Sequence, residues 1–349
     1  MRRRGFLAAL AGGAAGAAFG PARLGAAVAA TAGADRTLQS VRGPLDAAAL
    51  GTTLVHEHVL VDFGGAALAS RSRYDADEVF RVVLPHLEEL RRRGCQTLFE
   101  CTPAYLGRDP LLLRRLSEAS GLQIVTNTGY YGAARDIAVP KHAYRDTAER
   151  LAAGWTDEFR RGIEGTGIRP GFVKVGVDAG SLSPIDRKLV EAAALTHLAT
   201  GLTLAIHTGD GRAAVEIIAA LCGLGVSPEA YVWVHAQSEP DRATRAWAAQ
   251  QGAWVELDGI SPQTLDAHVE AVLDLQRRNR LDRVLVSQDA GWFHVGEPGG
   301  GSYRPHAFLF DAFVPELRAA GLADAAIQTL LVRNPAEAFT IRRRVTGGS

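Results

Sequence analysis

Two histidines stand one residue apart in the apolar stretch TLVHEHVLV. A strand alternates its side chains with a period of two, so His56 and His58 are expected to share one face. Val55, Glu57 and Val59 are expected on the opposite face, and Glu57 receives no chemical role. Because imidazole is the commonest metal ligand in proteins, two imidazoles aimed at one point predict part of a metal site. A single pair is a weak signal, so the prediction depends on further ligands from other strands.

Eight short β-rich segments recur between longer amphipathic ones. They span residues 52–61, 95–103, 122–131, 171–178, 202–210, 231–237, 253–259 and 283–291. Helix signals lie between them; one run begins at Ser183 and Pro184 and ends at Gly201. Eight strand–helix units predict an α/β protein, a single-domain (β/α)8 TIM barrel. A doubly wound open sheet is the alternative, but no glycine-rich phosphate turn follows the first segment.

Polar side chains stand near the carboxyl ends of five of these strands. They are His56 and His58 on the first strand, Lys174 on the fourth, His207 on the fifth, His235 on the sixth and Asp289 on the eighth. In a TIM barrel these strand ends meet at one mouth, so the six side chains are expected to converge. Buried polar groups need partners, and the evident common partner of four histidines and an acid is a cation.

Lys174 lies in the apolar segment FVKVGV. A protonated ammonium is costly to bury there and cannot bind a metal. Two solutions are open: an ion pair with Asp289 or another acid, or reaction of the amine with carbon dioxide to form a carbamate. A carbamate is an anion that can bridge two metal ions, and the charge balance of a two-metal site favours it.

This ordered set of ligand types resembles the phosphotriesterase family of the amidohydrolase superfamily. The resemblance extends from about Gly51 to the NPAEAF segment at 334–339. It implies two divalent metal ions, with zinc as the usual metal. In that arrangement His56, His58 and Asp289 bind the buried ion, His207 and His235 bind the exposed ion, and an N6-carboxylated Lys174 bridges both together with hydroxide.

The resemblance also implies a reaction, the hydrolysis of an ester-type bond. Water shared by two cations loses its proton near neutral pH and becomes the nucleophile, while a metal polarises the C=O or P=O group. Asp289 is the expected catalytic residue because it could accept the proton. The alternative for Asp289 is a role as a ligand only, since a metal-bound carboxylate is a weak base.

Loops after the strands are expected to select the substrate. Family members that hydrolyse lactones often carry a tyrosine after the third strand, so Tyr130 and Tyr131 favour a lactone or carboxylic ester; packing at the rim is the alternative. Asp258, at the end of the seventh strand, could orient a polar substrate group or serve a turn. Trp292 could cover the substrate from the loop at 291–308, which is either a mobile lid or an exposed connection.

Other function classes remain open. An organophosphate triesterase is one. A mononuclear amidohydrolase such as a deaminase would use the histidines and the aspartate but has no need of Lys174. A non-catalytic exported binding protein on a barrel scaffold is the third. Metal content and turnover separate these classes.

Residues 1–34 predict a signal peptide rather than part of the fold. They combine a basic start, an Ala/Gly-rich apolar run and a small-residue cleavage site, AGA, at 32–34. The arginine pair at 3–4 resembles a twin-arginine signal, so we expect the twin-arginine machinery to deliver the protein to the periplasm or the medium, without a stable membrane anchor. The mature hydrolase would then span residues 35–349.

Composition limits the partners. The 38 basic and 38 acidic side chains balance, so no charge footprint indicates nucleic acid, and a small-molecule substrate is expected. A homodimer is a candidate assembly. Cys95, Cys101 and Cys222 are too few for a disulfide framework, so no structural disulfide is expected. His294 and His306, in the loop at 291–308, are expected to be exposed.

Overall fold

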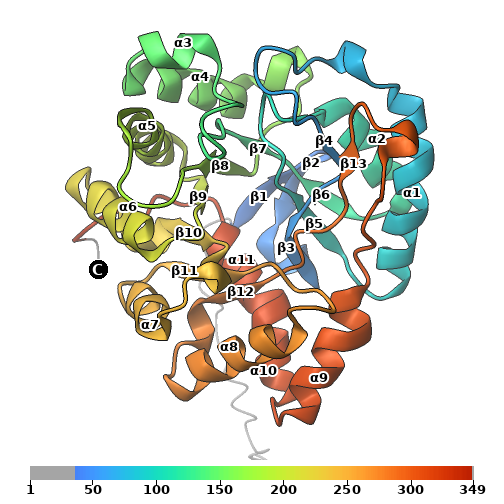
Figure 1. The fold of residues 1–349 in the computed structure, drawn as a ribbon, viewed down its shortest axis with the longest axis vertical. Helices are drawn as coiled ribbons and strands as arrows, with labels where there is room; N and C mark the ends of the chain where they lie inside the picture. The colour runs from blue at the N-terminus through green and yellow to red at the C-terminus, as the bar shows by residue number, and fades with distance from the viewer. Residues whose placement is uncertain (1–35, 348–349) are drawn as a thin grey trace, which may run out of the picture. The chain divides into compact units, whose positions relative to one another are not determined.

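A ring of parallel strands forms the centre of the computed structural model, which describes residues 36–347 (Figure 1). The strands are β3 (Thr53–Glu57), β5 (Thr97–Glu100), β6 (Gln123–Val125), β7 (Asn127–Thr128), β8 (Phe172–Gly176), β9 (Thr203–His207), β10 (Tyr231–Val234), β11 (Trp254–Leu257) and β12 (Val284–Val286). Only Thr126 separates β6 from β7, and together they form the third barrel strand. Each predicted strand segment therefore contains one strand of the ring.

Two parallel sheets make up the ring. One has the order β3-β5-β6, and the other has the order β7-β8-β9-β10-β11-β12. Backbone bonds just beyond β12 close the ring against β3. The amide of Asp289 donates to the carbonyl of His56 (3.1 Å), and the amide of His58 donates to the carbonyl of Ala290 (2.8 Å). The predicted (β/α)8 barrel is confirmed.

Helices surround the strands (Figure 1). They are α1 (Ala76–Arg92), α2 (Pro110–Ser120), α3 (Lys141–Arg145), α4 (Ala148–Arg161), α5 (Pro184–Thr200), α6 (Gly211–Gly223), α7 (Arg242–Gln250), α8 (Leu265–Arg277), α9 (Val314–Ala319), α10 (Asp324–Gln328) and α11 (Asn334–Phe339). The predicted signals delimit α5, because Ser183 forms a capping box with Asp186 and Gly201 adopts a left-handed conformation after the last turn. No described helix is long and apolar enough to cross a membrane.

Apolar side chains form two clusters, a larger one that contains residues of the helices and the strands and a smaller one, the inner layer, inside the barrel. The inner layer contains Val55, Phe99, Val125, Phe172, Ala205, Val232, Trp254 and Leu285, one from each barrel strand. Leu38 of β1 (Thr37–Ser40), which pairs with β2 (Gly43–Asp46), and Phe339 of α11 belong to the same cluster. Apolar side chains thus fill the barrel at the amino-terminal ends of its strands. Inward positions two or more residues later, such as Lys174 and His207, are left for polar side chains at the opposite mouth.

A β-bulge interrupts the alternation of β3. Leu54 lies opposite Leu98 of β5, whereas Glu57 lies opposite Glu100, so β3 carries one extra residue between these pairs. Val55 accordingly joins the inner layer, and the prediction that it faces outward with Glu57 is wrong. Beyond the bulge the prediction holds, because His56 of β3 and His58 just after it face the cavity and Glu57 does not.

The loop at 291–308 is anchored at both ends. Its first residues form β13 (Phe293–His294), which pairs with β4 (Leu60–Val61) beside the barrel mouth. Gly291 and Arg304 then exchange backbone hydrogen bonds in both directions, at 2.9 and 2.8 Å. His306 is buried, so the prediction that it is exposed is wrong. Cys95, Cys101 and Cys222 are free thiols. The predicted signal peptide lies outside the described residues.

Candidate metal centre

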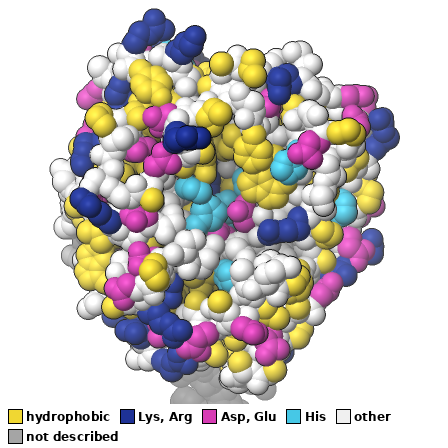
Figure 2. Space-filling view, viewed as in Figure 1, with side chains coloured by type: hydrophobic (Ala, Val, Ile, Leu, Met, Phe, Trp, Pro, Cys, Tyr) yellow, Lys and Arg dark blue, Asp and Glu magenta, His cyan; other side chains and the backbone are white. Residues whose placement is uncertain are grey.

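The six expected ligands line one cavity of about 90 Å³ at the carboxyl ends of the strands. They are His56, His58, Lys174, His207, His235 and Asp289. Phe63, Leu106, Tyr131 and Trp292 complete much of the wall. In Figure 2 histidine and acidic side chains are visible together near the centre of the barrel face. Side chains far apart in the sequence therefore share one site, as the barrel topology requires.

Hydrogen bonds determine which nitrogen of His58 faces the cavity. The Thr102 hydroxyl donates to the carbonyl of Leu60 (3.0 Å), so it must accept the proton of His58 Nδ1, 2.7 Å away. His58 Nε2 is then unprotonated and presents its lone pair to the cavity. A metal ligand needs this arrangement.

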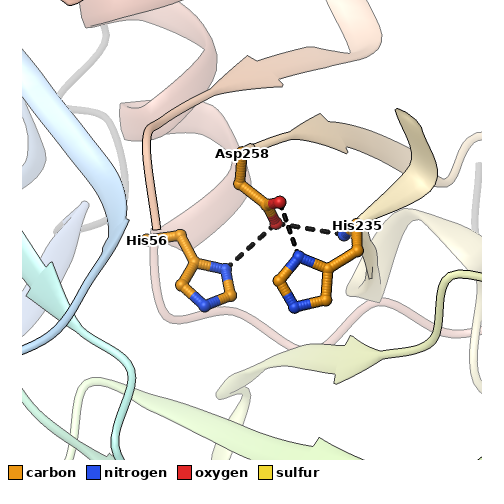
Figure 3. A group of neighbouring side chains, drawn as sticks. All are labelled: His56, His235 and Asp258. Carbon is orange, nitrogen blue, oxygen red and sulfur yellow. Dashed lines mark hydrogen bonds and ion pairs between the residues drawn. The ribbon is translucent and has the colours of Figure 1, made fainter. Parts of the chain in front are cut away.

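Asp258 orients two further imidazoles, those of His56 and His235. Its carboxylate lies between the rings of His56 and His235 (Figure 3). His235 Nδ1 donates to Asp258 Oδ1 at 2.6 Å, and His56 Nδ1 lies 3.1 Å from Asp258 Oδ2. Both Nε2 atoms are consequently left for the cavity, the usual arrangement of a carboxylate behind a metal-bound histidine.

Glu256 of β11 belongs to the site but is not among the residues predicted from the sequence. Its Oε1 lies 2.7 Å from His56 Nδ1, and the side chain is buried. Burial raises the pKa of Glu256 well above its ordinary value. The alternation in WVELD could have found it, because Glu256 shares a face with Trp254 and Asp258.

An unsatisfied oxygen indicates where a cation fits. Asp289 Oδ1 is buried and has no hydrogen-bond partner, yet it lies 3.0 Å from the unprotonated His58 Nε2 and 3.7 Å from His56 Nε2. Two lone pairs at this separation repel each other unless a positive charge lies near both. Ligand atoms of these three residues lie within 4.8 Å of one another. This donor set suits a borderline divalent ion such as zinc.

Burial keeps most of the imidazoles neutral in the metal-free protein. Desolvation, with a further contribution from Lys174, lowers the pKa of His56 to about 3. Desolvation also lowers the pKa values of His58 and His207 well below the ordinary value. For His235 desolvation acts in the same direction, but the adjacent Asp258 carboxylate outweighs it and raises the pKa. Neutral imidazoles are the form that binds metal.

Lys174 is buried beside His56 without an anionic partner. Its Nζ lies 3.4 Å from His56 Nε2, and the side chain is 2% exposed. Across residues 36–347 no carboxylate forms an ion pair with it, whereas Arg73 does pair with the buried Asp62 at 2.7 Å. The ion pair with Asp289 that was one of the two alternatives is therefore not formed.

The two tyrosines face different cavities. The hydroxyl of Tyr131 lies 3.1 Å from each ring nitrogen of His207, inside the histidine-lined cavity. Tyr130 turns away, with its hydroxyl 3.1 Å from His142 Nε2, and lines a separate cavity of about 420 Å³. Of the pair, Tyr131 is the one placed to meet a substrate at the centre.

Trp292 and Asp258 also differ in position. The centroid of the Trp292 ring lies 3.8 Å from that of the His58 ring. The Phe63 ring stacks on Trp292 with a centroid distance of 5.8 Å. These rings form an apolar wall at the mouth, and contact of Trp292 with a substrate stays a prediction. Asp258 is completely buried behind the histidines, so the expectation that it contacts the substrate does not fit its position.

Comparison with known proteins agrees with this geometry. Residues 36–339 match the sequence model of the phosphotriesterase family. The chain belongs to the phosphotriesterase family. It is 28% identical to the phosphotriesterase homology protein of Escherichia coli, over 83% of this chain and 98% of that protein. Another family relative, the phospho-furanose lactonase of Mycoplasmopsis agalactiae, is 26% identical over 87% of this chain and 91% of its own length.

Solved structures extend the agreement to three dimensions. The organophosphorus hydrolase from Deinococcus radiodurans superposes with a TM-score of 0.79 and 28% identity, over 88% of this chain and 98% of that one. The resemblance inferred from the ordered ligand types is thereby confirmed at the level of the family and the barrel.

Proposed function

We propose that this protein is a two-metal hydrolase that cleaves an ester-type bond in a small molecule, with a lactone or carboxylic ester as the favoured substrate. The observation that carries the proposal is the unpaired, buried Lys174 among three cavity-facing imidazole nitrogens and an unsatisfied Asp289 oxygen. Membership of a hydrolase family supports it.

Lys174 would hold both metals as a carbamate. Carbon dioxide adds to an unprotonated amine, a C–N bond forms, and one proton is released. The product is an anion, so carboxylation would remove the cost of a buried, unpaired cation. It would also supply a ligand between His56, His58 and Asp289 on one side and His207 and His235 on the other. A mononuclear amidohydrolase offers no comparable reason for this lysine.

Bound divalent ions supply two things at such a site, a nucleophile generated from water at neutral pH and polarisation of the scissile carbonyl. The protein's own groups complete the chemistry. Asp289 Oδ1 faces the cavity without a hydrogen-bond donor, and burial raises the pKa of Asp289, so this oxygen can accept a proton. Burial likewise raises the pKa of Tyr131 and keeps its hydroxyl a donor for the substrate carbonyl or the leaving oxygen.

The walls of the cavity favour a particular kind of substrate. The cavity of about 90 Å³ would hold the metal ions and the reacting group, so the rest of the molecule would lie at the mouth, against Trp292 and the 54% exposed Phe63. A compact cyclic ester meets this limit. A phosphotriester is the second candidate, because one solved relative is an organophosphorus hydrolase.

The proposal extends to location. We infer export by the twin-arginine machinery to the periplasm or the medium, from the twin arginines and the cleavage site in residues 1–34. Replacing both Arg3 and Arg4 with lysine should leave an unprocessed protein in the cytoplasm, measured by cell fractionation. Normal processing of that variant would contradict the inference.

A hydrolysis panel tests the substrate. The zinc-loaded protein is assayed with γ- and δ-lactones, aryl esters and phosphotriesters, and kcat/KM is compared. We expect the highest value for a lactone or carboxylic ester. Turnover of phosphotriesters alone would reverse the order of the two candidates, and no turnover of any of the three classes by metal-loaded protein would contradict the proposed function.

A further inference from the structure

Glu57, the last residue of β3, lies between His56 and His58 in the sequence but projects away from their cavity. Its carboxylate is completely buried and accepts four hydrogen bonds. The donors are Ser287 Oγ (2.8 Å), the Gln288 amide (3.0 Å), the Ala290 amide (2.8 Å) and His306 Nδ1 (3.0 Å). Three of the four donors belong to the short segment that carries Asp289.

The backbone at Asp289 needs such support. Its φ of 52° lies in the left-handed region, which an aspartate seldom adopts and which persists only where the surroundings impose it. Two contacts come from the backbone of β3 and the residue after it, to the carbonyl of His56 and from the amide of His58. Trp292 Nε1 donates to the carbonyl of Asp289 (2.7 Å), and the oxygens of Glu57 accept from the amides on both sides of Asp289.

We propose that Glu57 is a positioning residue for Asp289. Its carboxylate fixes the turn at 287–290, and that turn aims Asp289 Oδ1 at His58 Nε2, 3.0 Å away. The inference rests on the proposed role of Asp289 as a metal ligand. Glu57, the middle residue of the His-Glu-His stretch, thus holds Asp289 close to the histidines on either side of it.

The same carboxylate anchors the loop that follows. His306 binds Glu57 through Nδ1, and its Nε2 lies 2.9 Å from the Tyr303 hydroxyl. The end of the loop at 291–308 and the Asp289 turn therefore share one buried acceptor. Glu57 has to be a carboxylate for this purpose, because both of its oxygens accept from two donors. A glutamine would direct an NH2 group at one of these donor pairs.

A double-mutant cycle tests the inference. Zinc affinity is measured by chelator competition for the wild-type protein, for Glu57→Gln, for Asp289→Asn and for the double variant. We expect Glu57→Gln to weaken zinc binding about 10- to 100-fold when Asp289 is present, and less than about twofold when it is already replaced. An equal loss in both backgrounds, or an unchanged affinity in Glu57→Gln, would overturn the assignment.

Matched variants separate positioning from general destabilisation. Asp274→Asn removes a buried carboxylate of α8 that pairs with Arg278, remote from the cavity lining, and should leave zinc affinity unchanged. If Glu57→Gln does not fold, Ser287→Ala removes one donor to the same carboxylate. Its smaller loss of zinc affinity should also vanish in the Asp289→Asn background, and persistence there would overturn the proposal. A wild-type protein that binds fewer than two zinc ions would instead count against the proposed function.

Discussion

At the scale of single residues, the centre depends on hydrogen-bond partners that occupy Nδ1 of His56, His58 and His235. Thr102 holds the proton of His58, and Asp258 holds that of His235. Each partner leaves the opposite nitrogen free for a cation. The ligands could be predicted from the sequence because buried histidines are costly without a shared partner. The partner of His58 could not, because Thr102 resembles an ordinary strand residue until the barrel brings it beside the ring. The alternation in WVELD, by contrast, does contain a signal for Glu256.

Thr102→Val tests the hydrogen bond behind His58. Without the hydroxyl, Nδ1–H loses its buried acceptor and the ring is free to change tautomer. We expect zinc affinity to fall about 10- to 100-fold, measured by chelator competition. Thr126→Val is the matched control, since the buried Thr126 hydroxyl has no partner in the described structure and its removal should leave zinc affinity unchanged. Equal effects of the two substitutions would contradict the assigned role.

Tyr131→Phe tests the proposed substrate contact. Loss of one hydrogen bond to the reacting oxygen, worth about 0.5–1.5 kcal/mol, should lower kcat/KM roughly three- to tenfold without changing metal content. Tyr130→Phe should change neither, because Tyr130 lines the other cavity. Steady-state kinetics with the favoured substrate measures both. A larger loss for Tyr130→Phe than for Tyr131→Phe would exchange their roles.

At the scale of elements, the position of the histidines depends on one irregular strand. Alternation predicted that His56 and His58 share a face, but it also placed Val55 outward. The bulge in β3 becomes visible only through the register of β3 against β5, which a single sequence does not contain. The different directions of Tyr130 and Tyr131 could not be predicted from the sequence either, because they depend on where the third barrel strand ends.

Gly291→Ala tests the packing of the loop against β3. A Cβ at Gly291, where φ is 99°, would lie 1.8 Å from the carbonyl oxygen of His58. We expect a loss of at least about 3 kcal/mol in the free energy of unfolding, together with weaker zinc binding. Gly296→Ala is the control, since it has a similar φ of 93° but open space around it, and should cost only about 1 kcal/mol. Urea denaturation measures both, and equal losses would contradict the packing described here.

At the scale of the whole molecule, stability and chemistry occupy opposite ends of the barrel. The inner apolar layer fills the end beneath the strands' amino termini, and the polar side chains gather at the other end. This division made the fold and the ligand set predictable, because strand count and the position of polar residues along each strand are properties of the sequence. Substrate contacts were less predictable, because loops that are distant in sequence build the cavity wall.

Metal analysis of the purified mature protein determines whether Lys174 holds two metal ions. Metal content per chain is measured by elemental analysis for wild-type protein and for Lys174→Ala, both loaded with zinc and freed of excess ions. We expect two ions per wild-type chain, and one ion or fewer in Lys174→Ala together with loss of nearly all hydrolysis. A Lys174→Ala protein that keeps two ions and full activity would contradict the proposed role of Lys174, because this residue would then hold no metal.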